Sequence, residues 1–193
     1  MKILLFGATG SVGNAVLEAC CAAPIVEEVR AITRRPLMNT NSKLRTFVHQ
    51  DFLNYATVQE AFQSIDACLF CLGISATQVS KEDYRKITYS YTLAAANMFK
   101  AQCPGAAFHY ISGKGTSSAS RFLWARVKAQ TEYDLMELVA ADCWRPAFID
   151  AQPFSLSCLV PASSAAPIFL FKPSSGFFTW KHDFPRCKSF SLS

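Results

Sequence analysis

Short apolar runs alternate with longer segments of helical composition along residues 1–150. Six of these runs are predicted strands: Lys2–Phe6, Val29–Thr33, Leu44–Val48, Ala67–Cys71, Ala106–Ile111 and Cys143–Ile149. The first, Lys2–Phe6, is a continuous apolar run, which is typical of a parallel strand that is buried on both faces. Pro146 interrupts the last run, which indicates a strand that is irregular or lies near an edge of the sheet.

Four segments between the runs are predicted helices: Asn14–Ala22, Val58–Ile65, Glu82–Ala101 and Phe122–Ala140. Strands that alternate with helices form right-handed βαβ units, in which the helices cover both faces of a parallel sheet. The sequence therefore predicts an α/β fold with a doubly wound parallel sheet of the Rossmann type.

Residues 154–193 depart from this pattern, so we predict one domain over residues 1–153 and a divergent tail over 154–193. Half of the 40 tail residues are Phe, Ser or Pro, without a helical or alternating period. Residues 151–171 carry no charge, which raises the possibility of a membrane segment, but prolines and serines interrupt them. We therefore expect a tail that is loosely ordered or caps the sheet poorly, and no membrane partner.

The composition describes a chain that can bury a core, with 51% hydrophobic and 17% charged residues. The formal net charge is +5, but residues 1–153 carry 15 basic and 13 acidic groups, so no basic stripe indicates nucleic-acid binding. Eight cysteines without an export signal favour a reducing, cytoplasmic location. Cys68 and Cys71 have the spacing of half a zinc site, but their apolar run identifies them as core residues, and we predict no metal.

The strongest local signal lies between the first strand and the first helix. It consists of Gly7, Ala8, Thr9, Gly10, Ser11, Val12 and Gly13. Glycines permit a tight turn and a close approach to a ligand, and the amide groups at the start of the helix attract anions. Placed directly after a strand, this turn predicts a site for the diphosphate of a dinucleotide.

A second signal concerns the choice between NADP and NAD. The position after the second strand that holds a carboxylate in NAD-binding proteins here carries Arg34 and Arg35. Guanidinium groups pair with phosphate, so we predict NADP rather than NAD, the alternative being that both arginines lie in a solvated loop. Asp51 is placed to accept a hydrogen bond from adenine, and Gly73 permits a close approach of backbone to the cofactor.

Several motifs occur in an order that resembles the atypical short-chain dehydrogenases/reductases. They are GATGSVG at 7–13, TRRP at 33–36, Asp51-Phe52, Cys71-Leu72-Gly73, Tyr110-Ile111-Ser112-Gly113, WARVK at 124–128 and RPAFI at 145–149. The sequence is similar to the NmrA-like and Tat-interacting oxidoreductase-like branch, close to the NAD-dependent epimerases/dehydratases. This resemblance adds Phe52 and Leu72 to the expected cofactor contacts. It ends near residue 150, so we expect no recognisable substrate lobe, because the tail has diverged or the chain is shortened.

The resemblance also implies catalytic residues. In the family a Ser, a Tyr and a Lys work together, with Tyr and Lys one helical turn apart. Here Ser112 and Lys128 match, but Trp124 occupies the tyrosine position, and an indole does not ionise usefully. The resemblance implies that Lys128 can still bind the nicotinamide ribose. We expect Tyr84, Tyr89, Tyr110 and Tyr133 to be packed aromatics with satisfied hydroxyls, and His49 and His109 to lie at the surface or at sheet ends.

Three functional hypotheses follow from these residues. The first is an NADP-dependent oxidoreductase that acts on a small carbonyl or alcohol. The second is a non-catalytic NADP(H)-binding sensor that reports to a protein partner, which the loss of the tyrosine favours. The third is an inactive fragment whose sheet and substrate lobe are incomplete.

Overall fold

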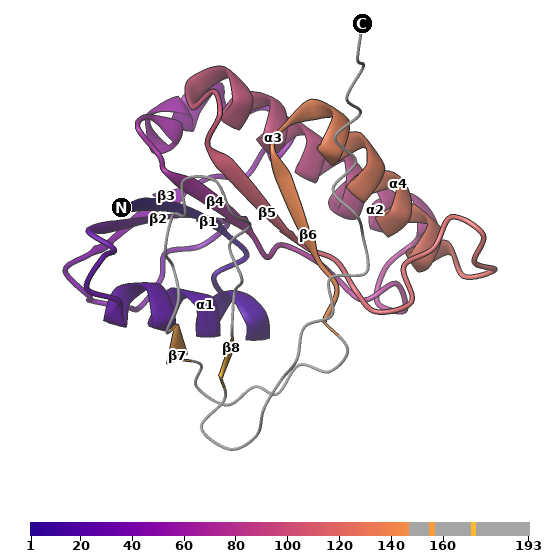
Figure 1. Ribbon diagram of the computed structural model, residues 1–193, viewed down its shortest axis with the longest axis horizontal. Helices are drawn as coiled ribbons and strands as arrows, with labels where there is room; N and C mark the ends of the chain where they lie inside the picture. Colours follow the sequence, from indigo (N-terminus) through magenta and orange to yellow (C-terminus); the bar gives the residue numbers. More distant parts are fainter. Residues whose placement is uncertain (147–154, 157–170, 173–193) are drawn as a thin grey trace, which may run out of the picture.

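The computed structural model describes residues 1–146, 155–156 and 171–172, and its centre is a six-stranded parallel sheet (Figure 1). The strands are β1 (Lys2–Phe6), β2 (Glu28–Thr33), β3 (Leu44–Val48), β4 (Ala67–Phe70), β5 (Ala107–Ile111) and β6 (Ala141–Trp144). Their order is β3-β2-β1-β4-β5-β6, so the direction of winding reverses between β1 and β4. This is the strand order of the Rossmann fold and confirms the predicted fold class.

Helices cover both faces of the sheet, with α1 below it in Figure 1 and α2, α3 and α4 above. Their bounds are α1 (Ser11–Ala22), η1 (Ala56–Phe62), α2 (Lys81–Arg85), η2 (Lys86–Ser90), α3 (Tyr91–Gln102) and α4 (Leu123–Leu138). The helix predicted over Val58–Ile65 is a 3₁₀ helix, η1, that begins and ends earlier. The long predicted helix over Glu82–Ala101 contains a π-helical turn, η2, between α2 and α3. No helix among the described residues has both the length and the apolar character that a membrane crossing needs.

The prediction for the last part of the chain is tested only up to residue 146. The sixth strand begins two residues before the predicted Cys143 and ends at Trp144, and β6 forms an edge of the sheet as predicted. Residues 147–149 of that prediction and the proposed boundary at residue 153 lie outside the described residues. Within the tail, β7 (Ser155–Leu156) pairs antiparallel with β8 (Phe171–Lys172).

Two hydrophobic cores lie on the two faces of the sheet because successive side chains of a strand point to opposite sides. In β1, Leu4 and Phe6 belong to the core beneath η1, α3 and α4. Ile3 and Leu5 belong to the core that packs against α1. All four side chains are fully buried, which explains the continuous apolar run of this strand.

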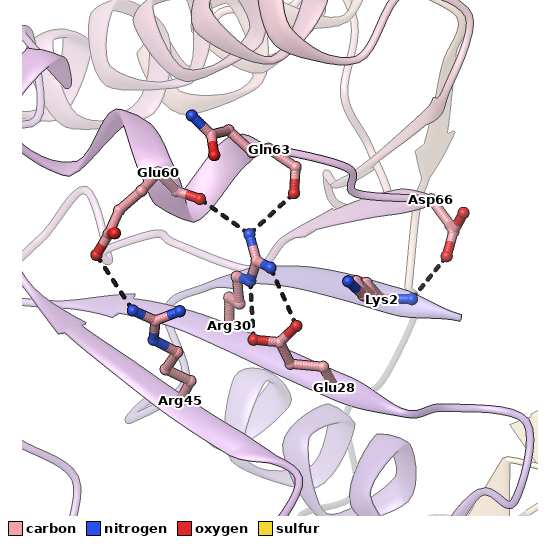
Figure 2. A network of polar contacts seen from close by, with 7 residues as sticks. All are labelled: Lys2, Glu28, Arg30, Arg45, Glu60, Gln63 and Asp66. Atoms are coloured by element: carbon pink, nitrogen blue, oxygen red, sulfur yellow. Dashed lines mark hydrogen bonds and ion pairs between the residues drawn. The ribbon is translucent and has the colours of Figure 1, made fainter.

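A buried arginine connects the sheet to η1 (Figure 2). Arg30 of β2 is only 8% exposed and donates two hydrogen bonds to the carboxylate of Glu28, at 2.9 and 3.0 Å. Its Nη1 donates to the backbone carbonyls of Glu60 and Gln63, both at 2.9 Å. These carbonyls belong to the end of η1, where the Glu60 carbonyl also accepts from the backbone amide of Gln63 at 3.2 Å. Arg30 therefore fixes the end of η1 to the sheet.

We predict that Arg30→Met lowers the free energy of unfolding by about 3 kcal/mol, because the Glu28 carboxylate loses its ion pair and the Gln63 carbonyl loses its side-chain donor. The matched control is Arg45→Met, whose exposed ion pair with Glu60 at 3.3 Å contributes at most about 1 kcal/mol. Urea denaturation of the two variants measures the difference. Equal losses for both variants would contradict the role assigned to Arg30.

Candidate functional site

The turn between β1 and α1 can be built only with glycine at two positions. Gly7 has φ +76°, and a Cβ there would lie 2.7 Å from backbone atoms of Cys71 and Leu72. A Cβ on Gly13 would lie 1.9 Å from the carbonyl oxygen of Gly7. The first turn of α1 therefore packs directly on the end of β1. The turn between β1 and α1 itself packs on the residues that follow β4.

The turn leaves the start of α1 open to an anion. Gly10 caps the helix without a side-chain hydrogen bond, and the first turn of α1 contains no acidic residue. The first amide groups of a helix have no acceptor within the helix, and they lie at the positive end of its dipole. Thr9, Gly10 and Ser11 are exposed, while Val12 is half-buried, so this end of the helix is accessible. A dinucleotide diphosphate fits this cradle.

The structure brings the other predicted cofactor residues to the same edge of the sheet. Arg34 and Arg35 follow β2 directly, and Asp51 follows β3 by two residues; all three are exposed. Gly73 follows β4 and is exposed, with open space where a Cβ would stand. The carboxyl ends of parallel strands on either side of the reversal point are where ligands bind in this fold.

Phe52 and Leu72, the two cofactor contacts added by the resemblance, pack into the core. The Phe52 side chain is 3% exposed and packs against the rings of Tyr55 and Tyr91, at 6.2 and 5.6 Å between ring centroids. Leu72 is half-buried and packs against the same core. The side chain of Phe52 is thus committed to the core, which leaves its backbone as the part able to meet a ligand.

Ser112 lies at the end of β5 in a short chain of hydrogen bonds. The Thr116 hydroxyl donates to the carbonyl of Gly113 at 2.8 Å, and Ser112 Oγ lies 3.1 Å from Thr116 Oγ1. A hydroxyl has one proton, so when Thr116 donates to Gly113 it accepts at the second contact and Ser112 donates. Ser112 therefore presents acceptor lone pairs to a ligand. Thr116 belongs to no recognised sequence pattern, and only the fold places it beside Ser112.

Trp124 and Lys128 lie one turn apart on α4, beside the loop that follows Ser112. A Cβ on Gly113 would lie 4.0 Å from the Trp124 ring and 3.9 Å from Lys128 Cδ. Gly115 has φ +86°, and a Cβ there would lie 3.3 Å from Cη2 of Trp124. The structure thus brings Ser112, Trp124 and Lys128 to one place, with the indole against this loop.

The Lys128 side chain is held against the end of β5. Its Nζ donates to the carbonyl of Ile111 at 3.2 Å and lies 5.3 Å from the centroid of the Tyr110 ring. Burial lowers the pKa of Lys128 to about 8, although the carboxylate of Glu132 opposes this shift. Near neutral pH the group remains an ammonium, but it can release its proton far more readily than an exposed lysine.

Tyr84, Tyr89 and Tyr110 are not placed as proton donors in place of the family's phenol. Tyr84 and Tyr110 are 2% and 1% exposed, and burial raises the pKa of both hydroxyls. Tyr89 donates to Asp134 at 2.6 Å. The rings of these three are packed, as predicted, but the prediction of a satisfied hydroxyl is wrong for Tyr110, whose buried hydroxyl has no hydrogen-bond partner among the described residues. The prediction of a packed ring is wrong for Tyr133, which is 60% exposed because it lies on the outer face of α4.

The prediction of a surface or sheet-end position holds for His49 and is wrong for His109, which lies within β5; both are buried, at 6% and 5% exposed. His49 does follow the end of β3, and its Nε2 lies 2.7 Å from the carbonyl of Asp51 and 3.0 Å from that of Asn54. His109 Nδ1 lies 3.3 Å from Trp144 Nε1 and 3.4 Å from a carboxylate oxygen of Asp142. Both rings are buried because local polar groups satisfy them.

The cysteines of the described part are free thiols, and Cys20 and Cys68 are fully buried in the two cores. Burial raises the pKa of Cys20, Cys71 and Cys143 to about 12, so these thiols are not reactive near neutral pH. Within residues 1–146, no group of three or more His, Cys, Asp or Glu side chains could hold a metal ion.

A model of the NAD-dependent epimerase/dehydratase family matches residues 3–142. Protein FMP52, mitochondrial, of Candida albicans is 24% identical over 143 residues, which cover 72% of this chain and 62% of that protein. Protein HTATIP2 of Rattus norvegicus is 26% identical over 142 residues, which cover 71% and 57%. The chain therefore spans less than two thirds of the length of these relatives.

Solved structures share the fold at low sequence identity. UDP-glucuronic acid 4-epimerase from Bacillus cereus, in complex with NAD, aligns with a TM-score of 0.62 and 17% identity, covering 75% of this chain and 56% of that one. The dTDP-glucose 4,6-dehydratase DesIV from Streptomyces venezuelae, a double mutant with NAD bound, aligns with a TM-score of 0.61 and 14% identity. That match covers 75% of this chain and 55% of the dehydratase.

We predict that Gly13→Ala lowers the free energy of unfolding by about 3 kcal/mol or more, because the new Cβ would overlap the Gly7 carbonyl. Gly10→Ala is the control, since a Cβ there meets the same oxygen at an ordinary 3.5 Å, and it should cost at most about 1 kcal/mol. Urea denaturation compares the two variants. A Gly13→Ala protein as stable as Gly10→Ala would disprove the close packing of α1 on β1.

Proposed function

The chain belongs to the NAD-dependent epimerase/dehydratase family, and from this membership we propose that it is an NADP-dependent oxidoreductase acting on a small carbonyl or alcohol. The observation that supports the proposal most strongly is the glycine cradle of Gly7 and Gly13, which leaves the start of α1 uncapped. A structural turn alone would not need this open helix end, whereas a diphosphate does.

Each part of the proposed site has a defined task. The amide groups at the start of α1 bind the diphosphate, and the ammonium of Lys128 donates to the ribose next to the nicotinamide. The bound dinucleotide supplies hydride chemistry at its nicotinamide ring. Ser112 and Lys128 orient the reacting oxygen of the substrate, and Lys128 is the group in this cluster whose pKa, about 8, suits a proton transfer near neutral pH.

Hydrogen-bond counting indicates which form of substrate Ser112 prefers. When the Thr116 hydroxyl donates to Gly113, the Ser112 proton goes to Thr116, and the Ser112 oxygen can accept a hydrogen bond from the ligand. An alcohol hydroxyl can donate such a bond, whereas a carbonyl oxygen cannot. We therefore propose that the alcohol form of the substrate is the form that Ser112 holds best.

The preference for NADP rests on residues of this chain rather than on its relatives, since the two solved structures contain NAD. Arg34 and Arg35 lie exposed after β2, where a carboxylate would bind the ribose of NAD.

A cytoplasmic location is part of the proposal, because the free thiols of the described part suit a reducing compartment.

Calorimetric titration of the wild-type chain with NADPH and with NADH tests the proposal. We expect NADPH to bind at least about tenfold more tightly, because two guanidinium groups can pair with its 2′-phosphate. In Arg34→Ala and Arg35→Ala, NADPH should bind more weakly, while NADH binding should stay within about twofold. Failure of the wild-type chain to bind either dinucleotide would overturn the proposed function.

Trp124 favours a second function, a non-catalytic sensor that binds NADP(H) and reports to a protein partner. The indole stands where the family has its phenol, and it packs on Gly113 and Gly115. It cannot deliver a proton to a substrate. A protein that keeps the cofactor cradle but lacks the proton donor is suited to sensing the dinucleotide rather than to turning it over.

Restoring the phenol distinguishes the two functions. If the chain is a sensor, the wild type will not oxidise NADPH with a panel of small aldehydes and ketones, and Trp124→Tyr will gain activity because the Lys128 ammonium activates the phenol. NADPH affinity should remain within about twofold in this variant. The double variant Trp124→Tyr/Lys128→Met is the control and should lose the gained activity. Oxidation of NADPH by the wild type above the protein-free rate would instead support the enzyme.

A further inference from the structure

We propose that Thr33 and Gln50 are positioning residues for the 2′-phosphate of the dinucleotide, acting through the backbone of Arg34 and Arg35. This inference rests on the proposed function and assigns a task to two residues that the sequence motifs leave without one. Neither side chain needs to touch the ligand. Each holds a carbonyl group in the segment that carries the two guanidinium groups.

Two consecutive backbone carbonyls after β2, those of Arg34 and Arg35, each accept a hydrogen bond from a different side chain. The Thr33 hydroxyl donates to the carbonyl of Arg35 at 2.6 Å, and Gln50 Nε2 donates to the carbonyl of Arg34 at 2.7 Å. Thr33 is the last residue of β2 and is 5% exposed, so its hydroxyl has few other partners. Two side chains thus fix two successive peptide groups in a segment that is otherwise exposed.

Gln50 reaches this segment because the pairing of β2 and β3 continues to the edge of the sheet. Thr33 is paired with Val48, and the amide of His49 donates to the carbonyl of Thr33 at 2.8 Å. The next residue, Gln50, therefore lies beside the Arg34 peptide group in the segment that follows β2. Two successive hydrogen bonds therefore join this side of the sheet, from His49 to Thr33 and from Gln50 to Arg34.

Pro36 restricts the same segment from its other end. The proline ring fixes its own φ and disfavours helical backbone at the residue before it, which is Arg35. With both carbonyls bonded as well, Arg34 and Arg35 retain little backbone freedom. Their side chains then need to order only their own rotamers when a ligand binds, which favours affinity.

The guanidinium groups themselves are available for an anion. Two nearby arginines are different in this respect. Arg30 of β2 pairs with the carboxylate of Glu28, and Arg45 of β3 pairs with the carboxylate of Glu60. Across residues 1–146 the structure gives Arg34 and Arg35 no such ion pair, although both are exposed. Two adjacent positive charges without a carboxylate suit a phosphate with two negative charges.

The test compares Gln50→Ala and Thr33→Val with the wild type by calorimetric titration with NADPH and NADH. We expect both variants to bind NADPH about tenfold more weakly and NADH within about twofold of the wild type, because NADH lacks the 2′-phosphate. Thr33→Ser keeps a hydroxyl and should retain the wild-type preference for NADPH. Gln59→Ala, at another exposed glutamine, is the matched control and should change neither affinity.

Each other outcome contradicts the inference in a recognisable way. An equal loss for NADPH and NADH means general damage to the fold, which thermal unfolding of the variants would show independently. Unchanged NADPH affinity in both variants overturns the positioning role while the NADP preference of the wild type stands. A wild type that binds NADPH and NADH equally overturns the preference itself, and the positioning role with it.

Discussion

The contact between Gly13 and Gly7 is the constraint on which the rest of the site depends. A single methyl group at Gly13 would stand 1.9 Å from the Gly7 carbonyl, so α1 can begin where it does only because neither residue has a side chain. The same turn packs on the backbone of Cys71 and Leu72. This contact therefore fixes where α1 begins relative to β1 and β4, and it places uncapped amide groups at the point where the strand order reverses.

Buried polar groups connect the loops of this protein to its sheet. Arg30 binds the end of η1, His49 lies against carbonyls of the segment after β3, and Glu132 of α4 forms an ion pair with Arg145, which follows β6. Each group is satisfied by backbone or by an opposite charge, as burial requires. The contrast with Arg34 is informative: an arginine that points into the fold is fully used by the protein, whereas one that lies exposed at the edge of the sheet is available to a ligand.

The loop after β5 accommodates the unusual tryptophan. Gly115 adopts a positive φ and leaves the indole of Trp124 room against the loop, while Lys128, one turn further along α4, keeps its bond to the end of β5. Ser112 and Lys128 thus lie beside one loop together with a bulky aromatic group that does not ionise. This combination separates binding of a dinucleotide from proton delivery, and the two candidate functions differ on that point.

The sequence by itself determined the strand–helix alternation, because short segments rich in apolar residues between helical segments are typical of a parallel sheet covered on both faces. It also determined the glycine turn, since a Cβ at Gly7 or Gly13 would overlap nearby backbone atoms. The burial of His49, the task of Thr116 and the bond from Gln50 to Arg34 were decided only by the tertiary structure. Each of these depends on a partner from a different segment or on the course of a loop. A hydrogen bond between such groups produces no periodic pattern of residues in the sequence.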